Sequence, residues 1–151
     1  MTKLILIPNQ EKMLEINCDA YLLGIKDLSV NMPIYFDIEN IKEILNNTNK
    51  KIFIALNKNM HSNDLIKLQE ILIELSKLNI EGIFFYDIGV LNIVKKLKLK
   101  LKLVWAQEHL ATNYETINYW LDKGVEYTLL SSEISEKEIL TIRKNTKSKL
   151  I

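Results

Sequence analysis

Short apolar runs recur along the chain, and each is followed by a segment whose apolar side chains repeat at helical spacing. The runs cover residues 4–7, 20–25, 52–56, 82–86, 103–106 and 127–130. Continuous apolar runs of this length are typical of strands that are buried on both faces of a parallel sheet. We therefore expect six strands, and Leu150 with Ile151 has the character of a seventh.

The segments between the runs predict helices. The clearest spans residues 64–78, where leucines at 65, 68, 72, 75 and 78 form one apolar stripe. Further helices are expected around residues 13–16, over 38–45 and 90–97, from 112 to a stop at 124, and from 135 to about 145. Residues 31–37 are expected to be irregular, because Pro33 argues against a helix there.

Polar residues and glycines mark where these helices begin and end. The expected caps are Asn9, Ser62 or Asn63, Thr112 in a capping box with Glu115, and Ser135 in a capping box with Glu138. Gly124 is expected to stop the helix that precedes it, and Gly89 to ease the turn into the helix that follows it.

The alternation of strand and helix predicts an α/β protein with a parallel sheet and helical crossovers, in a single domain over residues 1–151. Two architectures compete. A doubly wound sheet fits a chain of this length comfortably. A (β/α) barrel needs eight units, so about six units would form only a partial TIM-type barrel. Periodicity alone does not choose between them.

Composition narrows the function only slightly. The 151 residues are 48% hydrophobic and 26% charged, with a formal net charge of +1, which gives no argument for nucleic acid or membrane as a partner. Cys18 is the only cysteine, so this chain alone can form neither an intrachain disulfide nor a four-cysteine metal site. No signal peptide and no membrane-spanning run is visible, and we expect a cytoplasmic location.

Polar residues follow most of the expected strands, at the rim where barrels of this class carry out their chemistry. The candidates are Asp27, Asn57, Asp87, Gln107, Asn113 and Glu133, with His61 and His109 in nearby loops. We take Asn57, Asp87, Gln107 and Glu133 as candidate catalytic residues, and Asp27, His61 and Asn113 as candidate substrate-binding residues. Helix capping and turn formation are competing explanations for Asn113 and Asp87.

Other distinctive residues have structural explanations. Cys18, Trp105 and Trp120 are expected in the core. Residues 95–102 alternate lysine with leucine, which suits contact with RNA phosphates but fits better a solvated segment that leads into the fifth strand. No metalloprotease helix motif, serine nucleophile elbow or glycine-rich phosphate loop is present, and no metal site is expected.

The chain resembles the collagenase-like peptidase family U32. The resemblance is carried by the segments VWAQ at 104–107, TN at 112–113, INYW at 117–120 and LLSSEIS at 129–135, with weaker support from GIKDLSV at 24–30, ALN at 55–57, and GI at 82–83 with DIGVL at 87–91. It implies a TIM-type barrel of which this chain covers only the amino-terminal part. It also implies activity on peptides, as in members named proteases, or on RNA, as in tRNA and rRNA hydroxylation factors.

Two departures from the family bear on function. Ser132 stands where the family usually has an arginine, and the cysteines that some members use for iron–sulfur chemistry lie beyond Ile151. No iron–sulfur cluster is therefore expected from this chain, and its cofactor remains open. A partial barrel would also leave unpaired backbone groups at its first and sixth strands. We therefore expect self-association, most simply a twofold dimer, whether the chain is an enzyme or a non-catalytic module.

Overall fold

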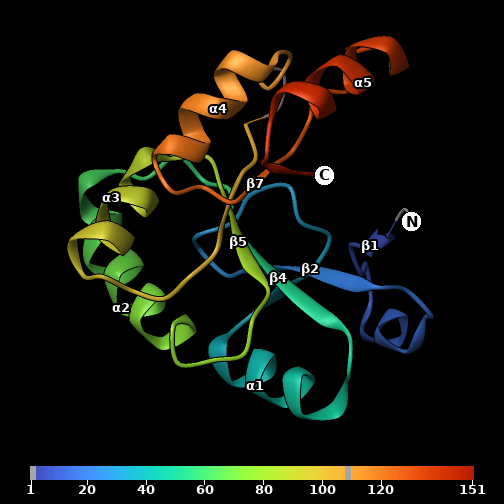
Figure 1. Cartoon of the computed structure of the whole chain (residues 1–151). Helices are drawn as coiled ribbons and strands as arrows, with labels where there is room; N and C mark the ends of the chain where they lie inside the picture. The colour runs from blue at the N-terminus through green and yellow to red at the C-terminus, as the bar shows by residue number, and fades with distance from the viewer. Residues whose placement is uncertain (1–2, 108–109) are drawn as a thin grey trace. The chain divides into compact units, whose positions relative to one another are not determined.

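The computed structural model describes residues 3–107 and 110–151 and confirms an α/β protein of parallel strands joined mainly by helices (Figure 1). The chain divides into two compact units, unit 1 (Met1–Leu101) and unit 2 (Lys102–Ile151), which we describe in turn. None of the helices in the described ranges is long and apolar enough to cross a membrane.

Unit 1 contains a parallel sheet whose strands lie side by side in the order β1-β2-β4-β5, with β3 also paired to β2. Its elements are β1 (Ile5–Leu6), η1 (Glu11–Glu15), β2 (Ala20–Ile25), β3 (Tyr35–Phe36), α1 (Ile38–Asn47), β4 (Lys51–Leu56), η2 (Ser62–Asp64), α2 (Leu65–Leu75), β5 (Gly82–Phe85) and α3 (Ile88–Lys96). The predicted strands β2 and β4 and the helix α1 are found within two residues of the expected bounds.

The core of unit 1 follows the predicted stripe. Leu68, Leu72 and Leu75 of α2 are fully buried, as is Ile41 of α1. All six residues of β2 are buried, which agrees with a strand covered on both faces. The α2 helix ends at Leu75, three residues before the expected end, and its first turn is preceded by the short 3₁₀ helix η2.

The strand β3 was not predicted. Tyr35 and Phe36 pair with Gly24 and Ile25 of β2. The strand β1 pairs with the opposite end of β2, where Ile5 lies beside Ala20. Two short strands therefore share one edge of β2, and the expectation of a wholly irregular segment over 31–37 is wrong for its last part.

Three other expectations for unit 1 are wrong. The first strand is not buried on both faces, since Leu4 and Ile7 beside it are 56% and 45% exposed. Asn9 does not cap the first helix, because η1 begins after Gln10 and has no side-chain cap. Neither Ser62 nor Asn63 caps α2. These two residues lie inside η2 instead.

Unit 2 contains three short parallel strands in the order β6-β7-β8. Its elements are β6 (Leu103–Trp105), α4 (Tyr114–Asp122), β7 (Tyr127–Thr128), α5 (Glu136–Asn145) and β8 (Lys149–Leu150). The rings of Trp105 and Trp120 stack with centroids 3.9 Å apart, and both side chains are buried as predicted. The seventh strand expected at the carboxyl terminus is confirmed as β8.

The helix signals of unit 2 are mostly confirmed. Ser135 and Glu138 form the expected capping box of α5. Gly124 follows α4 with φ +82°, a left-handed conformation that ends helices and favours glycine. The expected box of Thr112 with Glu115 is wrong, because α4 begins one residue later and is capped by Asn113.

The strand order decides between the two architectures left open by the sequence. In each unit the strands of the main path follow one another in space as they do in the chain, and only β3 lies off that path. A doubly wound sheet would reverse direction at a switch point, whereas a (β/α) barrel keeps its strands in chain order. The fold class is therefore a partial TIM-type barrel.

Candidate functional site

The carboxyl ends of β2, β4 and β5 gather four of the predicted site residues in unit 1. Asp27 follows β2, Asn57 and His61 follow β4, and Asp87 follows β5. Parallel strands deliver these residues to one edge of the sheet, which is the edge where (β/α) barrels bind their substrates. The hydrogen bonds of each side chain show which loops it holds in place.

Asn57 fastens the loop that follows the preceding strand. Its side-chain Nδ2 donates to the Val30 carbonyl at 2.9 Å, and its Oδ1 accepts from the Val30 N–H at 3.0 Å. The backbone N–H of Lys58 also donates to the Leu28 carbonyl. The amide of Asn57 thus pairs with both backbone groups of one residue, as a neighbouring strand would.

Asp87 makes the same kind of contact one strand further on. Its Oδ2 accepts from the backbone N–H of Met60 at 2.9 Å, in the loop after β4. Its Oδ1 accepts from the N–H of Gly89 at 2.7 Å and so caps α3. A Cβ at residue 89 would lie 2.9 Å from that same oxygen, so the glycine is needed for close approach and not for an unusual turn.

The buried hydroxyl of Ser29 links the loop after β2 to the neighbouring strand β4. Ser29 Oγ donates to the carbonyl of Ala55 at 2.5 Å and accepts from the N–H of Ile25 at 2.7 Å. Asp27 and Asn31 in this loop have φ of +69° and +55°. These residue types tolerate the left-handed region best after glycine, and such conformations persist where the surroundings determine them.

Two ion pairs involve residues at or next to this edge. Lys67 Nζ is 2.7 Å from Asp27 Oδ2, and Lys58 Nζ is 2.9 Å from Asp64 Oδ2. The hydrogen bond and charge of Lys67 lower the pKa of Asp27, and Lys58 with the His61 N–H lowers the pKa of Asp64. Both carboxyl groups are therefore ionised at neutral pH, which suits them to orient a substrate and not to donate a proton.

His61 holds its position through its backbone. Its N–H donates to Asp64 Oδ2 at 2.9 Å at the start of η2, and the residue is exposed. Within the described ranges, no group of three or more His, Cys, Asp or Glu residues lies close enough to hold a metal ion. The predicted substrate-binding role of His61 thus stays a prediction.

Unit 2 carries the remaining predicted residues. Asn113 Oδ1 accepts from the N–H of Thr116 and caps α4, which accounts for the residue structurally. Gln107 is half-buried after β6, and Glu133 is exposed after β7, with its N–H donating to the buried hydroxyl of Ser131. His109 and the neighbouring Glu108 lie outside the described residues.

The ion-pair lysines were missed by sequence reasoning. Asp27 and Lys67 are 40 residues apart in the chain, and no spacing rule connects them. Lys58 could have been predicted to lie at this edge, because it directly follows Asn57, which was itself placed there. The fold therefore defines the chain as a (β/α)-barrel protein. Its polar loops are held by hydrogen bonds at the edge where barrels of this class bind their substrates.

Comparison with known proteins gives the family. The chain belongs to peptidase family U32, whose sequence model matches residues 8–150. It is 28% identical over 136 residues to tRNA hydroxylation protein P2 of Bacillus subtilis (strain 168), a match that covers 88% of this chain and 44% of the relative. It is 27% identical over 139 residues to an uncharacterized protease of Methanocaldococcus jannaschii, covering 89% of this chain and 33% of that protein. No solved structure matches the chain.

Proposed function

We propose that the chain forms part of a U32-family enzyme that acts on peptides and that polar residues following its strands take part in the reaction. The observation that carries the proposal is the family match over residues 8–150, combined with loops that are fixed at the edge where barrels bind substrates. The M. jannaschii relative, an uncharacterized protease, supports the peptide as substrate.

In this proposal the predicted residues divide into two groups. Asn57 and Asp87 act as positioning residues, because each side chain binds the backbone of the preceding loop. Gln107 and Glu133 are the candidate catalytic groups, since they follow β6 and β7 directly. A carboxylate and an amide at strand ends suit general-base chemistry and the orientation of a scissile carbonyl.

A second candidate function is RNA hydroxylation. The B. subtilis relative is named a tRNA hydroxylation protein, and the match covers nearly all of this chain. The chain spans less than half the length of either relative, so the activity of a whole U32 protein is a proposal for this chain. A cytoplasmic location and a dimeric state belong to the same proposal.

One assay pair separates the two functions. The intact chain is incubated with gelatin-type peptides, and new amino termini are the readout. It is also incubated with unmodified tRNA in a cell extract that supplies the oxidant for hydroxylation, and the added oxygen is measured as mass. We expect peptide cleavage, and we expect Gln107→Ala and Glu133→Ala each to lower kcat/KM by about a hundredfold or more.

The matched control is Glu136→Ala, which removes an exposed carboxylate three residues further along the chain. Activity on tRNA alone would replace the peptide proposal with the second candidate. Unchanged peptide cleavage in both variants would show that the strand-end assignment of catalytic groups is wrong.

A further inference from the structure

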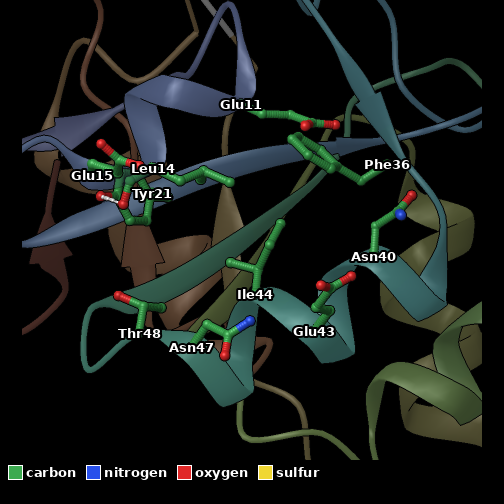
Figure 2. Close-up of a pocket in the computed structure, with 10 residues that line it drawn as sticks. All are labelled: Glu11, Leu14, Glu15, Tyr21, Phe36, Asn40, Glu43, Ile44, Asn47 and Thr48. Atoms are coloured by element: carbon green, nitrogen blue, oxygen red, sulfur yellow. Dashed lines mark hydrogen bonds between the residues drawn. The ribbon is translucent and has the colours of Figure 1, made fainter.

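A recess lies between η1 and α1 (Figure 2). Its volume is about 320 Å³, and Leu14, Phe36 and Ile44 supply its apolar surface. One wall is fixed by Tyr21, whose hydroxyl donates to the carbonyls of Leu14 and Ile16 and so ties η1 to β2. Burial, with Cys18 nearby, raises the pKa of Tyr21 to about 12, so this tie is neutral and intact across the physiological range. We call this recess the η1–α1 groove.

Three carboxylates surround the groove. Glu11 and Glu15 come from η1 and Glu43 from α1, and Figure 2 shows Ile44 pointing between them. Among the described residues, none of the three has an ion-pair or hydrogen-bond partner, and no lysine or arginine lines the groove. Asp27 and Asp64 near the strand-end edge are instead paired with lysines.

A groove with an apolar floor and an acidic margin is complementary to a lysine side chain. Lysine packs its four-carbon stem on apolar surface while its ammonium group stays in a polar environment. A small inorganic cation would leave the floor of Leu14, Phe36 and Ile44 uncovered. The volume is at the lower end of roughly 300–1,000 Å³ for ligand pockets, so it suits one or a few side chains.

The chain itself carries a segment of this chemistry. Residues 95–102 read KKLKLKLK and run from the last turn of α3 to the start of β6. Lys96, Lys98 and Lys100 are exposed, and none forms an ion pair with another described residue. Lys98 has φ +52°, which turns the chain sharply after α3. The segment follows β5 and α3, and none of its residues lines the groove.

We propose that the η1–α1 groove binds the lysine run of residues 95–102 from a second copy of this chain. The argument is charge complementarity: a margin of three unpaired carboxylates matches the exposed ammonium groups of Lys96, Lys98 and Lys100, and the lysine stems cover the apolar floor. Charge pairs of this kind govern which partner is accepted and how strongly salt weakens the contact.

Charge reversal with complementation tests the proposal in the intact chain. One variant carries Glu11→Lys and Glu43→Lys, and the other carries Lys98→Glu and Lys100→Glu. Sedimentation velocity over a concentration series at low and high salt measures the dimer Kd. We expect wild type to dimerise with a Kd that rises with salt, and each variant alone to show a Kd about tenfold higher or more. An equimolar mixture should restore dimerisation, because each reversed groove then meets a reversed run.

The controls reverse exposed charges outside both surfaces. Glu70→Lys with Glu136→Lys matches the first variant in net charge, and Lys137→Glu with Lys147→Glu matches the second. Both controls should dimerise like wild type, and circular dichroism confirms the fold of every variant. A monomeric wild type at low salt, a mixture that stays monomeric, or controls that dissociate as readily as the variants would each overturn the proposal.

Discussion

Asn57 is the residue on which the geometry of the loop after β2 depends most directly. Replacing it with alanine leaves the N–H and carbonyl of Val30 without their partners. We expect Asn57→Ala to lower the free energy of unfolding by about 1 kcal/mol, because two solvent-accessible backbone groups exchange their protein hydrogen bonds for bonds to water. Denaturant unfolding measures the change.

The control is Asn59→Ala, which replaces an exposed asparagine two residues away and should change stability by less than about 0.5 kcal/mol. Equal losses in the two variants would mean that the Val30 contact contributes nothing.

At the scale of single residues, the sequence predicted where polar residues lie in the fold better than it predicted what their side chains do. Asp87 and Asn113 were selected because polar residues follow strands, and both do lie at helix starts. The same short polar side chain that serves chemistry also satisfies free N–H groups, so pattern alone cannot separate the two uses. The contact of Asp87 with Met60 joins residues 27 apart, and only the fold reveals it.

At the scale of elements, the turn after α4 gives a direct test. Gly124 has φ +82°, and a Cβ there would meet no atom within 4 Å. We expect Gly124→Ala to cost about 1–2 kcal/mol of stability through backbone strain alone, and Gly124→Asn to cost less, since asparagine tolerates the left-handed region. Thermal and denaturant unfolding measure both. Identical losses for the two substitutions would contradict a conformational cause.

Long periodic elements were predictable and short ones were not. The α2 stripe and the apolar runs of β2 and β4 contain enough residues for burial to impose a pattern. The strand β3 has two residues, so its pairing with Gly24 and Ile25 depends on the neighbouring edge and not on its own sequence. The cap of α4 was missed by one residue because Thr112 and Asn113 are both good caps, and Asn113 makes the bond.

At the scale of the whole molecule, the first strand offers an incomplete sheet edge. Within the described residues β1 pairs on one side only, with β2, and Leu4 beside it is 56% exposed. Edge strands of this kind invite pairing with another chain, and a lysine on the edge blocks it. We expect Leu4→Lys to reduce association at high salt, where charge contacts are screened. Light scattering measures it.

Leu140→Lys is the matched control, because Leu140 is 55% exposed but lies on a helix. If both substitutions reduce association equally, general surface hydrophobicity and not the strand edge is the cause.

The loop contacts of Asn57 and Asp87 also have a consequence for the order of folding. Each loop is fastened by a side chain that lies after the next long strand: the loop after β2 by Asn57, and the loop after β4 by Asp87. During synthesis, which proceeds from the amino terminus, neither loop has its fastening residue when it leaves the ribosome. Each loop acquires its final shape one strand behind the growing end, so this edge of unit 1 is completed in step with translation.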